Sequence, residues 1–358
     1  MIRVRIAAVA AVAFAACLMV WPAASAADAG GVVELPVSFT VTNSNTSQAP
    51  CFSDGATYVV RGHITGPQSA LSSGRGGTIT VYLYGYEGGE WNWHFKGVPG
   101  YDYATEMAKL GHVSLTIDEL GYGASGIPRD GNLTCQGAEA DVTHQIVQQL
   151  RSGRYSVGGG RGIGFSKIVL AGHDVGGQVG QIEAYSYSDI DGLIVMTYAD
   201  QGFTQYILQR SIVAASDWCT VSPAETQPGS PTSYVHYVSQ EEWRTLLFYD
   251  ADPRVIDATD AVRLPNPCGI VRSVPTAVEF DLAHDSQIKV PVLVAFGNND
   301  TLVWSRQGEE QQQSNYGSTD KSTVFVPYGG HFLMFGRRSG PLLRSAVSSW
   351  LDSRFRGP

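Results

Sequence analysis

Three residues of types that take part in catalysis, Asp174, Asp300 and His331, each stand in a turn directly after a short apolar run. Short apolar runs bounded by turn residues are typical of buried strands. In open α/β sheets, functional groups gather outside the carboxyl ends of the strands. A carboxylate can act as a nucleophile, a histidine as a general base, and a second carboxylate can orient that histidine. We therefore expect these three side chains to form one catalytic group.

The stretch around Asp174 predicts a strand, a sharp turn and a helix. Its sequence from residue 167 to residue 180 is KIVLAGHDVGGQVG. Gly172 and Gly176 flank the aspartate, and glycine is needed where a strained residue leaves no space for neighbouring side chains. Turns of this kind hold a nucleophile, most often serine, at the top of a sheet. An aspartate at this position needs no base to activate it, because a carboxylate is ionised at neutral pH.

Strand-like and helix-like segments alternate along the chain, which predicts a mostly parallel, doubly wound α/β sheet covered by helices on both faces. The first two strands alternate apolar and polar residues and are expected to be antiparallel at one edge. The expected strands are residues 32–42, 56–64, 78–84, 112–117, 168–170, 191–196, 290–296 and 322–326. The expected helices are residues 101–110 and 137–151, a segment after Asp174, and residues 342–355.

The pattern changes after the sixth expected strand. Prolines and aromatic residues become frequent, and strand-like runs stop until Val290. We predict a cap inserted over the carboxyl edge of the sheet, where the sites of α/β proteins lie. The predicted division is a signal peptide at 1–26, a core at 27–201 and 287–358, and a cap at 202–286.

Residues 1–26 have the features of an export signal. Arg3 and Arg5 precede an apolar run, and Ala24-Ser25-Ala26 resembles a cleavage site. The run is short for a membrane span. We therefore expect a secreted protein without a stable membrane anchor. The formal net charge of −9 argues against nucleic acid as a partner.

The cysteines predict two disulfides. Cys17 lies in the expected signal peptide, and an even number of four remains in a chain that we expect to be exported. We expect the pairs Cys51–Cys135 in the core and Cys219–Cys268 in the cap; buried free thiols are the alternative. No cysteine and histidine spacing resembles a zinc site, and we expect no cofactor or metal.

The order of nucleophile, acid and histidine, together with four motifs, resembles the α/β-hydrolase superfamily over nearly the whole chain after the signal. The motifs are VLAGHDVGG around Asp174, the loop TIDELGYGASG, VLVAFGNND ending at Asp300 and YGGH ending at His331. The resemblance implies an oxyanion hole formed by the backbone N–H groups of Tyr86 and Val175.

Within this superfamily, an aspartate at the turn is similar to the nucleophile of epoxide hydrolases and haloalkane dehalogenases. The resemblance implies that Asp174 attacks an sp³ carbon and forms an alkyl-enzyme ester. His331, oriented by Asp300, would then activate the water that hydrolyses this ester. The expected substrate is an apolar small molecule, and opening of an epoxide by water is the favoured reaction.

The choice of electrophile depends on neighbouring residues. The resembled dehalogenases, and typical epoxide hydrolases, carry Trp after the nucleophile, where this chain has Val175. Superfamily members commonly have His-Gly after the third strand, where this chain has Tyr84-Gly85. Trp91 and Trp93 could donate to a halide, although core packing is the simpler interpretation. Epoxide hydrolases use cap tyrosines on the opening oxygen, and the candidates here are Tyr206, Tyr234, Tyr237 and Tyr249.

Other interpretations stay open. One is a secreted esterase or lipase-like hydrolase with Asp in place of Ser, and another is a non-catalytic relative that binds apolar small molecules. Asp200, after the sixth strand, is a second position from which an acid could reach His331. His173 is expected to pack at the turn, and Asp118 to order its glycine-rich loop.

Overall fold

The computed structural model describes residues 31–72, 75–213, 219, 230–300 and 305–356. The expected signal peptide, residues 1–26, lies outside these ranges. Within them, no helix is both long enough and apolar enough to cross a membrane.

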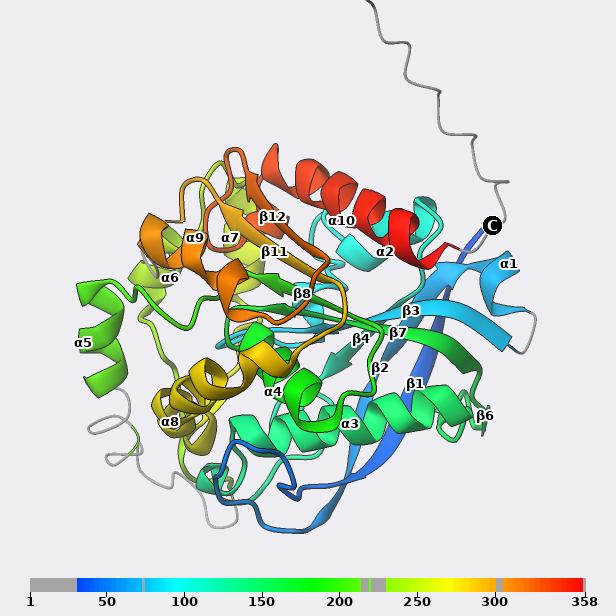
Figure 1. The fold of residues 1–358 in the computed structure, drawn as a ribbon, viewed down its shortest axis with the longest axis horizontal. Helices are drawn as coiled ribbons and strands as arrows, with labels where there is room; N and C mark the ends of the chain where they lie inside the picture. Colours follow the sequence, from blue (N-terminus) through cyan, green and yellow to red (C-terminus); the bar gives the residue numbers. More distant parts are fainter. Residues whose placement is uncertain (1–30, 73–74, 214–218, 220–229, 301–304, 357–358) are drawn as a thin grey trace, which may run out of the picture.

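A ten-stranded sheet forms the centre of the molecule (Figure 1), with its strands in the order β12-β11-β8-β7-β3-β4-β2-β1-β5-β6. Neighbouring strands from β12 to β4 are parallel, and the other pairs are antiparallel. The predicted mostly parallel sheet is therefore confirmed. The strands are β1 Val32–Thr42, β2 Thr57–Pro67, β3 Arg75–Leu83, β4 Ser114–Asp118, β5 Ser156–Val157, β6 Gly160–Arg161, β7 Gly164–His173, β8 Gly192–Met196, β11 Val292–Gly297 and β12 Lys321–Val326.

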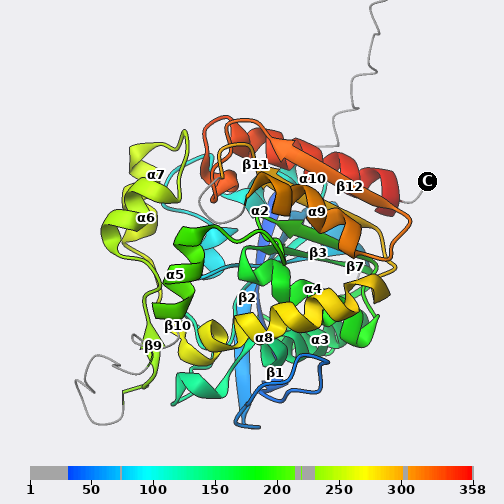
Figure 2. The same ribbon diagram turned by 60° about the vertical axis from the view of Figure 1, so that its left-hand side comes forward.

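Helices cover both faces of the sheet (Figures 1 and 2). On one face α2 contacts α10, whereas α3, α4 and α8 contact one another on the other face. The apolar residues of α3 recur at helical spacing, and Val142, Ile146 and Leu150 are buried. The helices are α1 Gln68–Leu71, α2 Tyr103–Lys109, α3 Gln136–Ser152, α4 Val175–Tyr187, α5 Gln205–Val213, α6 Gln240–Leu246, α7 Pro253–Asp260, α8 Cys268–His284, α9 Arg306–Asn315 and α10 Ser339–Phe355.

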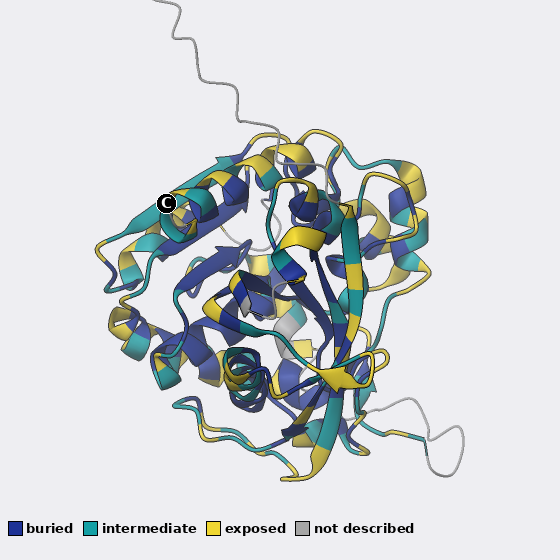
Figure 3. Cartoon of the chain, turned by 90° about the vertical axis from the view of Figure 1, so that its right-hand side faces the viewer, coloured by how far each residue is buried: buried dark blue, intermediate teal, exposed yellow. Residues whose placement is uncertain are grey.

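The centre of the sheet is the core of the protein. Every residue of β8 and of β11 is buried, as expected for parallel strands covered on both faces. Figure 3 shows this burial in the sheet and in the parts of the helices turned toward it, while exposed residues lie on the outside.

The chain between β8 and β11 is mainly helical. It contains α5, α6, α7 and α8, and its two short strands, β9 Tyr234–Val235 and β10 Asn266–Pro267, pair as a separate sheet. In Figure 1, α5 and α6 lie beyond the end of the sheet at which the arrow of β8 points. The last helix, α8, instead packs beside the sheet against α3 and α4. The limits of the cap at 202 and 286 remain a prediction.

Both disulfides join the predicted pairs. Cys51–Cys135 links the loop after β1 to the residue that precedes α3. Cys219–Cys268 links the segment after α5 to the first residue of α8.

Candidate active site

The turn between β7 and α4 holds Asp174 in a strained conformation, with φ 52° and ψ −133°. Non-glycine residues seldom adopt positive φ, and such strain is common at functional sites. The flanking glycines make the turn possible, because a Cβ on Gly172 would lie 2.1 Å from the Gly176 carbonyl oxygen. A Cβ on Gly176 would lie 2.5 Å from the carbonyl oxygen of Tyr84, the residue directly after β3. The sharp turn therefore depends on close backbone packing.

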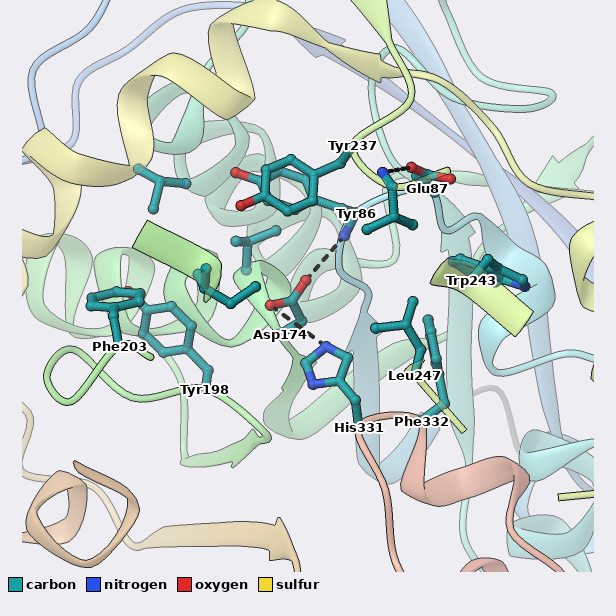
Figure 4. A pocket seen from close by; sticks show the side chains of 14 residues that line it. Tyr86, Glu87, Asp174, Tyr198, Phe203, Tyr237, Trp243, Leu247, His331 and Phe332 are labelled. Carbon is teal, nitrogen blue, oxygen red and sulfur yellow. Dashed lines mark hydrogen bonds and ion pairs between the residues drawn. The ribbon is translucent and has the colours of Figure 1, made fainter. Parts of the chain in front are cut away.

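One oxygen of the Asp174 carboxylate is held by the loop after β3 (Figure 4). The Tyr86 backbone N–H donates to Asp174 Oδ2 over 3.2 Å. This approach requires Gly85, since a Cβ there would lie 2.3 Å from the same oxygen. Oδ2 thus occupies the place that the sequence predicts for an oxyanion.

The other oxygen faces the histidine. His331 Nε2 lies 3.9 Å from Asp174 Oδ1, which is too long for a hydrogen bond. On its far side, His331 Nδ1 lies 2.9 Å from Asp300 Oδ2. Asp300 and His331 are 2% and 5% exposed, so the pair is shielded from solvent. The three residues predicted to act together therefore do lie together, in the order Asp174, His331, Asp300.

Burial and charge shift the protonation of these groups. Burial raises the pKa of Asp174, and His331 together with the backbone N–H groups of Tyr86 and Val175 only partly offsets this. Burial alone would lower the pKa of His331, but the Asp300 and Asp174 carboxylates outweigh it and the pKa is raised. Asp300 thus stabilises the histidinium form.

His173 lies beneath this group, as predicted. Its Nε2 lies 2.9 Å from the His331 carbonyl oxygen, and its ring stacks on Phe332 at 5.0 Å between centroids. Burial, and then the neighbouring His331, lower the pKa of His173 well below its usual value. His173 is therefore a neutral donor that fixes the backbone of the turn at His331.

A pocket opens above Asp174 and His331 (Figure 4). Its volume, measured at the centres of water-sized spheres, is about 60 Å³, so it has room for a small substrate group. Besides Asp174 and His331, its polar lining residues are Tyr86, Glu87, Tyr198 and Tyr237. The apolar walls are Val175, Phe203, Ile207, Val238, Trp243, Leu247, Val274 and Phe332.

Of the four candidate tyrosines, Tyr237 lines this pocket, where its ring stacks on Tyr86 at 4.5 Å. The other three lie elsewhere. The Tyr206 hydroxyl lies 2.8 Å from Glu242 Oε1, Tyr234 donates to the Pro128 carbonyl, and Tyr249 is 44% exposed.

The remaining candidates also lie outside the pocket. Asp200 accepts hydrogen bonds from Gln181, Gln312 and Asn315, and is not the acid beside His331. Asp118 orders its loop, as predicted, through the N–H groups of Glu90 and Ala124. Trp93 donates to the Leu83 carbonyl and Trp91 packs on Trp243, which agrees with core packing.

Glu87 is a residue that sequence reasoning missed. It is buried, accepts a hydrogen bond from the Val238 N–H at 2.8 Å, and pairs with Arg263. Its own N–H donates to Asn266 Oδ1 at 2.6 Å. Its position directly after Tyr86 could have marked Glu87 as a residue near the site. The local sequence could not reveal its partner Arg263, which lies 176 residues later.

The described residues contain two groups of side chains that could hold a metal ion, and neither includes Asp174, Asp300 or His331. The side chains gathered around His331 are two carboxylates, and the backbone N–H of Tyr86 lies beside them.

A family model described as serine aminopeptidase, S33 (Hydrolase_4), matches residues 101–338, more than half of the chain. The chain belongs to this family of α/β-hydrolases. Among curated proteins, none is similar to it at a significant level. The family description names a serine enzyme, whereas this S33-type hydrolase has Asp174 at the turn.

Solved structures share the fold at low identity. A soluble variant of Saccharomyces cerevisiae monoglyceride lipase is 15% identical with a TM-score of 0.62, covering 88% of this chain and 96% of the lipase. An esterase from Thermogutta terrifontis is 18% identical with a TM-score of 0.55, covering 89% and 100%. Paleococcus ferrophilus monoacylglycerol lipase is 16% identical with a TM-score of 0.54, covering 77% and 94%. At these identities the likeness concerns the fold.

Proposed function

We propose that this hydrolase uses Asp174 as a nucleophile and forms a covalent ester with an apolar small molecule, most favourably an epoxide. The observation that carries the proposal is that the two carboxylate oxygens of Asp174 have different neighbours. Oδ2 accepts a hydrogen bond from the Tyr86 N–H, while Oδ1 lies nearer to His331 Nε2. This arrangement suits attack by one oxygen and charge stabilisation at the other.

In the first step, Asp174 Oδ1 forms a bond to a ring carbon and the carbon–oxygen bond of the epoxide breaks. The released oxygen takes a proton from a tyrosine hydroxyl. Tyr86 and Tyr237 are the candidates, because their stacked rings line the pocket with their hydroxyl oxygens at the same end of the stack (Figure 4). Burial raises the pKa of Tyr86 well above its usual value, so its hydroxyl stays protonated until it donates.

In the second step, His331 Nε2 removes a proton from water, and the resulting hydroxide attacks Cγ of Asp174. Negative charge then develops on Oδ2, where the Tyr86 and Val175 N–H groups stabilise it. Collapse breaks the ester bond, the leaving alkoxide takes the proton held by His331, and the diol is released. The new carboxylic acid of Asp174 loses its proton to water, and the tyrosine hydroxyl regains a proton from water, which restores the starting site. His331 Nε2 lies 3.9 Å from Asp174 Oδ1, so the proposed base stands next to the carboxyl group that the water attacks.

The second candidate function is hydrolysis of a carboxylic ester. It is supported by the S33 family match and by the esterases and lipases among the similar structures, which fit it better than epoxide opening. In this case Asp174 would form a mixed anhydride with the acyl group, or act as a general base on water.

The test traps the intermediate in the His331→Gln variant, which lacks the base for the second step. The variant is incubated with a panel of epoxides, haloalkanes and aryl esters, and the peptide that carries Asp174 is analysed by mass spectrometry. We expect an epoxide to add its full mass to Asp174, and the His331→Gln/Asp174→Asn double variant to gain no mass.

The outcomes separate the two candidates. An adduct from an epoxide at Asp174 supports the first. Turnover of aryl esters by the wild type, with no adduct from any epoxide, overturns epoxide opening in favour of ester hydrolysis. An epoxide adduct that survives in the double variant would place the nucleophile elsewhere and contradict the role of Asp174.

A further inference from the structure

A second cluster of polar groups lies away from the pocket, on the face of the sheet covered by α3 and α4. It consists of His144 on α3, Glu183 on α4 and Asp189 in the loop that leads to β8. One ligand atom from each residue lies within 4.8 Å of those of the other two. His144 Nδ1 is 3.0 Å from Asp189 Oδ2 and 4.0 Å from Glu183 Oε1.

The Glu183 side chain is fully buried, and neither of its oxygens accepts a hydrogen bond from an N–H group of the described residues. Burial, and then the adjacent Asp189 carboxyl, raise the pKa of Glu183 well above its usual value. Asp189 Oδ1 and His144 Nδ1 likewise have no hydrogen-bond partner within the part of the chain that the structure describes, although His144 Nδ1 is close to Asp189 Oδ2. Asp189 Oδ2 accepts a hydrogen bond from the Gln148 side-chain amide. Each of the three residues thus brings at least one unpartnered atom to the cluster. Burying an unpaired carboxylate is strongly unfavourable, so this arrangement calls for a positive group among them.

A comparable cluster elsewhere already contains such a group. Glu34, His94 and Asp102 also bring three potential ligands together, and the ammonium of Lys96 contacts both of their carboxylates. That cluster is balanced by the chain itself.

No described lysine or arginine side chain plays this part beside Glu183. Arg151, whose charge acts on Glu183, directs Nη2 to Asp191 Oδ2 at 2.8 Å and Nε to the backbone carbonyl of Asp189 at 3.1 Å. It does not bond to either carboxylate of the cluster. The two clusters thus differ in the one feature that decides whether a cation is needed.

We propose that His144, Glu183 and Asp189 bind a divalent transition-metal ion, with Zn²⁺ as the best match. An imidazole nitrogen with two carboxylates is a donor set that suits zinc, whereas calcium and magnesium take oxygen ligands. Tetrahedral zinc with bonds near 2.1 Å separates its ligand atoms by about 3.4 Å, and the two observed separations of 3.0 and 4.0 Å bracket this value.

The surroundings complete a built site. The His144 ring stacks on Tyr187 at 4.0 Å with an interplanar angle of 15°, which fixes the direction of Nδ1. The His144 and Asp189 side chains are 26% and 19% exposed, so the ion can enter and a water can complete its coordination. The sequence search for cysteine and histidine spacings could not find this site, because two of its ligands are carboxylates.

A bound ion would join α3, α4 and the start of the loop to β8. Glu183 lies nine residues after Asp174 at the start of the same helix, about 13 Å along its axis. The ion would therefore act on the stability of the helix that carries the turn and not on the reacting atoms.

The experiment uses the purified protein without a polyhistidine tag, first treated with a chelator and then titrated with ZnCl₂ by calorimetry. We expect one saturable site per chain and a rise in melting temperature on zinc addition. We expect CaCl₂ to bind at least 100-fold more weakly. Glu183→Gln should weaken zinc binding at least 100-fold, and Glu34→Gln, in the cluster balanced by Lys96, should leave it unchanged.

If Glu183→Gln fails to fold, the partly exposed His144→Gln takes its place with the same expected loss. The proposal is overturned if the wild type shows no saturable zinc binding, because the cluster would then be neutralised by a proton shared between the carboxylates or by a protonated His144. It is equally overturned if zinc binding is as tight after substitution of Glu183 or His144.

Discussion

At the scale of single residues, the candidate site depends on where the two oxygens of one carboxylate lie. A serine at the turn would present one hydroxyl to His331, but Asp174 places Oδ2 on the Tyr86 N–H and leaves Oδ1 toward the histidine. The same residue can therefore supply both the attacking oxygen and the oxygen that later bears the charge. In the proposed mechanism, His331 then has one role, the activation of water.

This task predicts a pH dependence. His331 accepts a proton only when neutral, and its pKa is raised because Asp300 and Asp174 outweigh burial. Hydrolysis of the ester by the wild-type protein should therefore speed up as pH rises through the pKa of His331, which in the ester is held up by Asp300 alone because esterified Asp174 carries no charge. Asp300→Asn removes this charge, so the midpoint should move to lower pH while the maximal rate falls about 10³- to 10⁴-fold.

Single-turnover rates between about pH 5 and pH 9 measure both effects in the range where histidine titrates. A midpoint that stays in place in Asp300→Asn would contradict the proposed coupling of Asp300 to His331.

At the scale of elements, the loop after β3 joins the core to the segment above the site. Tyr86 directs its N–H at Asp174, and the next residue, Glu87, pairs with Arg263. Arg263 donates to the Val238 carbonyl, and its guanidinium lies 4.9 Å from the ring centre of Trp243, a wall of the pocket. The buried ion pair of Glu87 and Arg263 thus connects the loop that carries the Tyr86 N–H to the pocket wall at Trp243.

Glu87→Gln tests this link. The change removes one of the two buried carboxylates that pair with the Arg263 guanidinium and leaves Asp260 as its partner. Losing one charged hydrogen-bond partner of a buried group costs about 1–3 kcal/mol. We expect a loss of this size in urea unfolding, together with a raised KM because the pocket wall is released.

The matched control is Asp257→Asn, which breaks the exposed pair between Arg244 and Asp257, 40% and 61% exposed. Exposed pairs contribute less than about 1 kcal/mol, so this variant should keep wild-type stability and KM. Equal effects of the two substitutions would rule out a special role for Glu87.

At the scale of the whole molecule, the sheet brings distant loops to one edge. β3 lies between β4 and β7, and β11 between β8 and β12, so the loops that carry Tyr86, Asp174, Asp300 and His331 all leave neighbouring parallel strands at their carboxyl ends. Sites form at this edge of α/β sheets because the connections diverge there. The antiparallel strands β1 and β2 lie away from the site, and a disulfide stabilises that side of the molecule.

The Cys51–Cys135 disulfide secures that side, joining residues 84 apart in the sequence. Closing a loop of this length limits the unfolded chain and is expected to stabilise the fold by about 4 kcal/mol. The Cys51→Ser/Cys135→Ser variant should lose stability of this order in urea unfolding. At low temperature, its rate of substrate hydrolysis should match that of the wild type, because neither cysteine lines the pocket. An unchanged unfolding midpoint would contradict the prediction.

The local pattern of the sequence was enough to predict much of the fold. Runs of apolar residues and glycine-rich turns predicted the main strands, the turn at Asp174 and the helix after it. The four cysteines that follow the expected signal peptide, two in the core and two in the cap, led to both disulfide pairs. These features depend on interactions between residues close in the chain, or on few enough cysteines that the alternatives are small in number. Helix α9, Arg306–Asn315, was not expected, because it is rich in polar residues and has little apolar periodicity.

The sequence predicted Asp300 beside His331, with Asp200 as the second choice, and the structure places Asp300 there. Other features depended on the tertiary structure. Only packing decided that Tyr237 faces the pocket among four tyrosines and that Glu87 meets Arg263. The physical reason is that burial and charge pairing join residues through space. The sequence by itself determined which chemistry-bearing residues follow the strands, and the tertiary structure decided which of them meet.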